Sequence, residues 1–144
     1  MPGIDTEAIA RAAFGQIQQR FPALRMVEEQ NPHVEISITL PIQPGLEQQV
    51  WLCLQNNDEL HFSVGHFWCE WFPCTMPEKV ESYVAAVCGY VSGEYRIIEG
   101  RRFGRCIRAK LQRPCGGSWE TIASWSRLHI PVPWLVRWAE LRNA

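Results

Sequence analysis

Residues 58–93 constrain the fold of this chain more than any other stretch, because a strand pattern, an abrupt stop and a helix pattern follow one another directly. Apolar side chains alternate with polar ones from Leu60 to Val64, as in a strand with one buried face. The parity of the apolar positions then shifts by one at Gly65, which predicts a bulge or a tight bend. We expect the rest of the chain to pack on this stretch.

The second half of this stretch predicts an amphipathic helix. Thr75 is a candidate N-cap with Glu78 at capping-box spacing, and Pro77 lies in the first turn, where a proline costs no hydrogen bond. The apolar residues that recur at helical spacing are Val80, Tyr83, Val84, Val87, Cys88 and Val91. Gly93 suits the position after the helix, because glycine adopts the left-handed conformation without penalty.

The same two periodicities predict the other elements of the chain. They are a helix over 5–21, strands over 33–41, 47–55, 94–99, about 103–112 and 118–125, and a terminal helix from about Pro133 to Arg142. Gly100 is the expected turn of the hairpin that the strands on either side of it form. Trp138 and Leu141 are expected on the apolar face of the terminal helix.

This order of elements, α-β-β-β-α-β-β-(β)-α, is typical of the α+β class. We expect a single domain over residues 1–144, with an antiparallel sheet of about five to six strands and helices packed mainly on one face. The order of elements resembles that of type III secretion chaperones, small proteins that hold an unfolded effector segment. That similarity covers most of the chain, and it implies a protein-binding role.

The net charge of −1 conceals a strong asymmetry along the chain. Residues 1–95 hold twelve acidic and four basic residues, whereas residues 96–144 hold ten basic and three acidic ones. The bases of the expected hairpin are Arg96, Arg101, Arg102, Arg105, Arg108, Lys110 and Arg113, of which we predict that the first six bind a partner. Guanidinium groups suit bidentate contacts with carboxylate or phosphate, which indicates an anionic partner.

These hairpin bases have two interpretations that the sequence leaves open. They form a docking face for an acidic polypeptide, or they solvate an outer sheet face and pair with acids of residues 1–95. Nucleic acid is a less favoured ligand, because the sequence pI is near 6.4 and neither an RNP-like aromatic pattern nor a Gly-rich phosphate loop accompanies the arginines.

Two groups of residues are candidates for chemistry. Cys74 directly precedes the expected helix, and a helix N-terminus favours the thiolate, but no signature of a cysteine hydrolase is present. Four residues of zinc-binding types lie close in sequence: His61, His66, Cys69 and Cys74. Their spacing matches no zinc knuckle, so we interpret them as strand and core residues. We therefore expect no catalytic residue, no metal and no cofactor.

The six cysteines are expected to be reduced thiols, because no export signal precedes them. Cys74 and Cys115 lie in expected loops and should be exposed, whereas the other four should be buried. No apolar run approaches the roughly 20 residues that span a bilayer. These features favour a cytoplasmic protein without a membrane span.

The sequence therefore favours a non-catalytic protein-binding module, chaperone-like or adaptor-like, that engages an acidic polypeptide or a second copy of itself. One alternative is a small-ligand binder or a thiol-dependent enzyme with a pocket between sheet and helix. A second alternative is a nucleic-acid binder that uses the Arg-rich hairpin.

Overall fold

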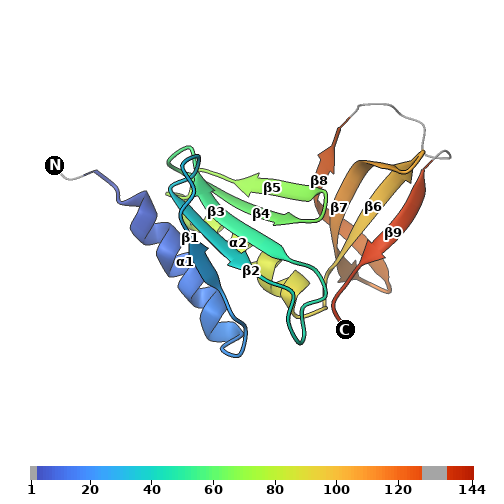
Figure 1. Ribbon diagram of the computed structural model, residues 1–144, viewed down its shortest axis with the longest axis horizontal. Helices are drawn as coiled ribbons and strands as arrows, with labels where there is room; N and C mark the ends of the chain where they lie inside the picture. The colour runs from blue at the N-terminus through green and yellow to red at the C-terminus, as the bar shows by residue number, and fades with distance from the viewer. Residues whose placement is uncertain (1–2, 128–135) are drawn as a thin grey trace.

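The computed structural model describes residues 3–127 and 136–144, which form two helices and two antiparallel sheets (Figure 1). The elements are α1 (Thr6–Arg20), β1 (Val27–Glu29), β2 (Ile36–Leu40), β3 (Val50–Gln55), β4 (Glu59–Val64), β5 (Phe67–Trp71), α2 (Pro77–Val91), β6 (Arg96–Arg102), β7 (Arg105–Cys115), β8 (Ser118–Ser126) and β9 (Arg137–Leu141). The α+β class is confirmed. The expectation of a single sheet is wrong, because the strands after α2 form a sheet of their own.

The first sheet is a meander in which strands adjacent in sequence are neighbours, in the order β1-β2-β3-β4-β5. Its faces follow the alternation in the sequence, so that Leu52 of β3 lies opposite Phe62 of β4 and both are fully buried. The parity shift at Gly65 is a tight turn that joins β4 to β5, and Gly65 adopts a φ of 58° there. This left-handed backbone explains why glycine occupies the position.

The two helices pack against each other and against the apolar side chains of the first sheet. Asp5 caps α1, since its side chain accepts a hydrogen bond of 3.0 Å from the backbone N–H of Ala8. The capping box predicted for α2 is wrong: the N-cap residue is Met76, which makes no side-chain cap hydrogen bond. Tyr83 of α2 donates a hydrogen bond of 2.8 Å to the carbonyl of His61, which fastens the helix to β4.

The second sheet has the strand order β8-β7-β6-β9. The β6–β7 hairpin turns at Phe103 and Gly104, not at Gly100 as the sequence suggested. Gly100 lies within β6, at a bulge that shifts the register between Gly100 and Arg101. A Cβ atom at Gly100 would lie 2.6 Å from Val136 Cγ1 and 3.1 Å from Trp138 Cζ3, so only glycine allows β9 to pack this closely.

The expected terminal helix over 133–142 is wrong in its described part, because residues 137–141 form β9 beside β6. Residues 133–135 lie outside the described residues. A segment this short fits both periodicities, and the open edge of β6 supplies the hydrogen bonds that decide for the strand. Trp138 and Leu141 consequently separate: Leu141 packs on the core, while Trp138 is 44% exposed.

The two sheets share one continuous hydrophobic core, which includes Ile97, Ala109 and Leu111 of the second sheet. β5 lies against β8 at this junction. The end of the chain is fastened to the β2–β3 connection and to α2 by Asn143, whose side chain accepts from the Glu47 N–H and donates to the Tyr90 carbonyl. Within the described residues, neither helix is long and apolar enough to cross a membrane.

Candidate functional site

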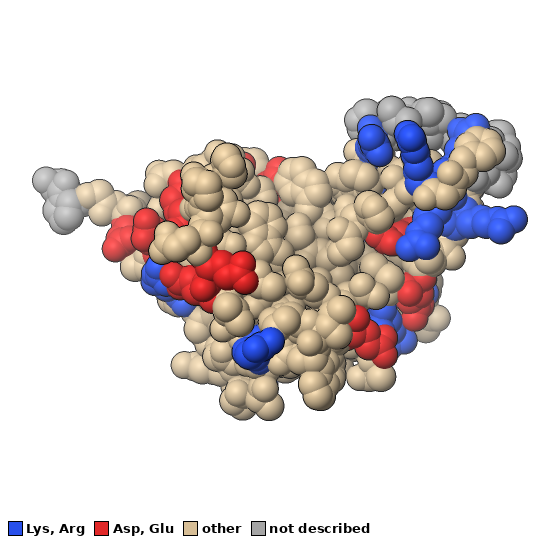
Figure 2. Space-filling view, in the orientation of Figure 1, with Lys and Arg blue, Asp and Glu red and all other residues tan. Residues whose placement is uncertain are grey.

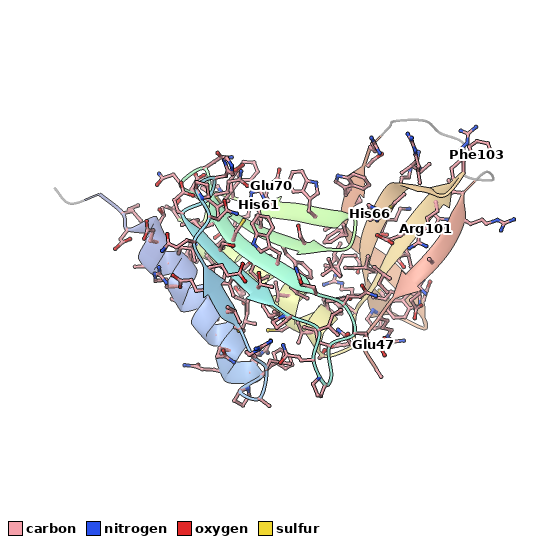
Figure 3. All side chains as sticks on the ribbon, in the orientation of Figure 1. Glu47, His61, His66, Glu70, Arg101 and Phe103 are labelled. Atoms are coloured by element: carbon pink, nitrogen blue, oxygen red, sulfur yellow. The ribbon has the colours of Figure 1, made fainter. Side chains whose placement is uncertain are left out.

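The tip of the β6–β7 hairpin, residues 101–105, projects from the end of the second sheet (Figure 3). Phe103 occupies the turn with a φ of 51°, and its side chain is 92% exposed. A phenylalanine at such a position contributes almost nothing to the core and keeps a full aromatic face in water. Arg102 precedes it and Arg105 follows Gly104, so the tip joins one aromatic ring to several guanidinium groups.

A pocket of about 600 Å³ lies beside this hairpin tip. The residues that line it are Arg101, Arg102, Phe103, Gly104, Arg137, Trp138 and Ala139. The β9 side of the pocket arises from strand pairing, which places Arg137 opposite Arg101 and Trp138 opposite Gly100. None of its described lining residues is acidic, so the pocket offers aromatic surface and positive charge together.

Three hairpin bases are neutralised by carboxylates of the same sheet. The ion pairs are Arg96–Glu140 (2.9 Å), Arg101–Glu99 (2.8 Å) and Arg113–Glu120 (2.8 Å). Arg96 also donates to Gln112 and lies 4.3 Å from the centroid of the Trp119 ring. These pairs engage all three acidic residues of 96–144. Among the described residues, no ion pair joins a base of the hairpin to an acid of residues 1–95. The interpretation in which the hairpin bases pair with those acids is therefore not supported.

The other predicted binding residues are Arg102, Arg105, Arg108 and Lys110. Arg105 is exposed at the start of β7, and the Arg102 Cζ lies 5.2 Å from the centroid of the Phe103 ring. The Arg102 Nε is buried without a hydrogen-bond partner in the part of the chain that the structure describes. Lys110 Nζ lies 5.2 Å from the centroid of the Trp138 ring, and Arg108 is half-buried on β7.

Arg137 is a residue of this surface that sequence reasoning missed. It is exposed on β9, in register with Arg101, and it lines the pocket. The periodicity of its own segment predicted a helix, and no local pattern places it beside the hairpin. Figure 2 shows Lys and Arg side chains gathered at this end of the molecule, whereas acidic side chains predominate at the other end.

A second group of polar side chains lies where the two sheets meet, around Glu99 of β6. Glu99 is only 2% exposed, yet its Oε1 accepts from Arg101 and its Oε2 lies 2.9 Å from both the backbone nitrogen and Nδ1 of His66. Burial acts to raise the pKa of Glu99. The hydrogen bonds from Arg101 and His66 outweigh burial and lower the pKa, so the carboxylate stays charged.

Cys106 of β7 completes this junction cluster, which we define as His66, Glu99 and Cys106. One donor atom from each lies within 4.8 Å of the other two. The thiol is 6% exposed and donates to the Arg108 carbonyl, with a sulfur–oxygen distance of 3.2 Å. Burial and then the Glu99 charge raise the pKa of Cys106, so the free thiol is protonated near neutral pH.

The four zinc-type residues of the sequence pattern do not come together. His61 stacks on Trp68 with ring centroids 5.5 Å apart, Cys69 lies opposite Phe62, and His66 faces Glu99 instead. Within the described residues, the junction cluster is the one group of three or more such side chains close enough to share a metal ion. Glu99 and Cys106 were missed because they belong to the other sheet.

Cys74 is buried, with 1% exposure, which contradicts the expectation of an exposed loop thiol. Burial and then the Asp58 carboxylate raise its pKa, the opposite of what a nucleophile at a helix N-terminus requires. The adjoining pocket of about 380 Å³ lies between α1 and α2, and no histidine is among its described lining residues. The structure therefore gives no support to a thiol-dependent enzyme at Cys74. Cys115, by contrast, is exposed as expected.

Comparisons with known proteins were made at three levels, and no family model, no curated protein and no solved structure matches this chain. The expected resemblance to type III secretion chaperones has no support from these comparisons, and the described order of elements departs from the expected one because it ends in a strand. Function must be inferred from the hairpin tip and the junction cluster themselves.

Proposed function

We propose that this protein is a non-catalytic binding module that engages an acidic polypeptide through the hairpin tip, the adjoining pocket and Arg137. The observation that carries the proposal is the 92% exposure of Phe103 between arginines. Phe103 makes no contribution to folding that explains its place at the tip, and burial against a partner would remove its apolar surface from water.

The residue types of the tip suit a protein interface. Aromatic residues and arginine are enriched at the centres of such interfaces, where they supply most of the binding energy. Trp138 adds a second aromatic surface to the pocket, and Arg102, Arg105 and Arg137 supply donors for carboxylates. A peptide that carries acidic residues around one apolar side chain would match both features.

The distribution of charge favours a polypeptide over nucleic acid. The basic surface occupies one end of the molecule (Figure 2), and the acidic excess of residues 1–95 would repel a polyanion that extends past that end. Domains that bind nucleic acid usually have a pI above about 9, whereas the pI here is near 6.4. A short acidic segment avoids this repulsion, because it needs to contact only the tip.

Fluorescence anisotropy tests the proposal. The probes are labelled peptides rich in Asp and Glu around one Leu or Phe, a matched peptide with Lys in place of the acids, and a single-stranded oligonucleotide. We expect selective binding of the acidic peptides that weakens on Phe103→Ala, while Arg25→Ala, at an exposed base far from the hairpin in sequence, has no effect. Tighter binding of the oligonucleotide, or equal binding by the Phe103→Ala variant, would overturn the proposal.

Self-association is a separate outcome of the same experiment. A second copy of the chain presents the acidic surface of residues 1–95, to which the basic tip of the first copy is complementary. Such a contact would be head-to-tail and would give rings or open filaments instead of a two-fold dimer. Sedimentation of the unlabelled protein over a range of concentrations, with and without Arg105→Ala, separates self-association through the tip from binding of another polypeptide.

A further inference from the structure

The junction cluster brings together a nitrogen, an oxygen and a sulfur donor from three separate segments. His66 comes from the β4–β5 turn, Glu99 from β6 and Cys106 from β7. Imidazole, carboxylate and thiolate are the three ligand types that zinc uses in proteins. Figure 3 shows His66 at the turn that faces the second sheet, with Arg101 on the strand opposite.

We propose that His66, Glu99 and Cys106 form a metal site for a divalent cation of the zinc type. Three protein ligands leave one coordination position open to water or to another donor. Soft thiolate and imidazole ligands disfavour Mg²⁺ and Ca²⁺, which take oxygen ligands. Metal binding would cross-link the two sheets, since its ligands belong to both.

The distances fit a small contraction of the site. Ligand atoms around a tetrahedral zinc ion lie roughly 3.3 to 3.8 Å apart, given bond lengths of about 2.0 to 2.3 Å. The three donor atoms of the cluster already lie within 4.8 Å of one another. His66 is the side chain free to adjust, because it is 60% exposed and lies in a turn.

Glu99 is already oriented for such a role, because its two oxygens have different partners. Oε1 accepts from Arg101, and Oε2 faces His66. A carboxylate ligand usually has an outer hydrogen-bond partner of this kind, which fixes its orientation. Arg101 is therefore a positioning residue of the proposed site. The net charge of a divalent cation, the Cys106 thiolate and the Glu99 carboxylate is zero. The positive charge of Arg101 therefore also favours an anionic donor at the open coordination position.

The proton and bond changes on binding balance simply. Cys106 gives its thiol proton to solvent as the sulfur–metal bond forms, and its weak contact with the Arg108 carbonyl is lost. His66 exchanges its Nδ1–H contact with Glu99 for a bond from Nδ1 to the metal. The Nδ1 proton passes through solvent to Nε2 of a neutral ring, or is released to solvent from a charged ring, so that Nδ1 is free to bind. No electron transfer is involved, so no oxidant or reductant is needed.

Cobalt(II) binding tests the site, with the full chain reduced and freed of metal by a chelator. We expect a single equivalent of Co²⁺ to give a thiolate-to-cobalt charge-transfer band and tetrahedral ligand-field bands, and Zn²⁺ to abolish both. Cys106→Ser should remove the charge-transfer band. His66→Gln, at a side chain that is 60% exposed, should weaken binding by about tenfold or more. Cys115→Ser is the matched control, because Cys115 is an exposed thiol outside the cluster. It should change neither the charge-transfer band nor the affinity for Co²⁺.

Three results would overturn the proposal. They are the absence of the charge-transfer band, its persistence in the Cys106→Ser variant, and unchanged Co²⁺ affinity in the His66→Gln variant. Circular dichroism of each variant before titration establishes that loss of the band reflects loss of a ligand and not unfolding. The result is independent of the binding function of the hairpin tip, which the anisotropy experiment measures without added metal.

Discussion

Glu99 on β6 and His66 in the β4–β5 turn are joined by two contacts of equal length, since Oε2 lies 2.9 Å from the backbone nitrogen and 2.9 Å from Nδ1 of His66. The turn approaches closely because Gly65 precedes His66: a Cβ atom there would lie 3.0 Å from the same oxygen. With Arg101 on the other oxygen, Glu99 forms a charged connection between the two sheets.

Replacing Glu99 with Gln should destabilise the protein by about 1–3 kcal/mol, because a buried amide N–H₂ would face donors that now point at a carboxylate. Urea unfolding followed by tryptophan fluorescence measures the change. Glu120→Gln is the control, since Glu120 forms an exposed pair with Arg113 and should cost less than about 1 kcal/mol. Equal losses in the two variants would contradict the role given to Glu99.

The stability of the protein should fall on acidification partly through Glu99. The pKa of this carboxyl is lowered in the folded state, so its contribution is fully present above the ordinary value of 4.5 and is lost as the pH falls through the folded-state pKa. The measurement is the free energy of unfolding of the wild type and of Glu99→Gln from neutrality to below that value. The difference in the free energy of unfolding between the wild type and Glu99→Gln should shrink as the pH falls. A difference that does not change with pH would contradict this role of the Glu99 charge.

Two helical glycines should respond in opposite directions to alanine. Gly15 of α1 has nothing within 4 Å of an added Cβ, so Gly15→Ala should stabilise the protein by about 0.5–1 kcal/mol through helix propensity. A Cβ at Gly89 of α2 would overlap the ring of Tyr95, so Gly89→Ala should destabilise by about 1–3 kcal/mol despite the same propensity gain. Thermal unfolding of both variants measures the contrast. A shift of both unfolding temperatures in the same direction would contradict it.

Variants of the hairpin tip should separate binding from folding. Phe103→Ala and Arg105→Ala remove exposed side chains, so each should change the free energy of unfolding by less than about 0.5 kcal/mol. The same variants should weaken binding of an acidic peptide, and the Arg105→Ala effect should diminish as salt screens the charge. A large loss of stability in either variant would show that the tip has a structural role.

The cysteines should differ sharply in reactivity in the folded protein. Cys115 is exposed, whereas burial raises the pKa of Cys74 and raises that of Cys53 to about 12. Brief alkylation with iodoacetamide, followed by peptide mass spectrometry, should modify Cys115 first and Cys74 only after unfolding. Rapid modification of Cys74 would contradict its burial and would support a thiol-dependent enzyme at this residue.

Local patterns in the sequence were sufficient for most elements of the first sheet and for the class of the fold. Alternation identified β2, β3 and β4, helical spacing identified α1 and α2, and the parity shift at Gly65 marked a turn. These signals work because a side chain's face depends only on its own strand or helix. The charge asymmetry was equally visible, and it identified the bases of the β6–β7 hairpin, although the turn was expected at Gly100 and lies at Phe103 and Gly104.

Only the tertiary structure decided what lies side by side. The open edge of β6 converts residues 137–141 from an expected helix into β9, and that pairing brings Arg137 and Trp138 to the hairpin tip. The meeting of the two sheets brings His66 to Glu99 and Cys106, and the β6–β9 pairing brings Arg96 to Glu140. Such contacts join residues far apart in the chain, and their energies depend on distances that no local periodicity encodes.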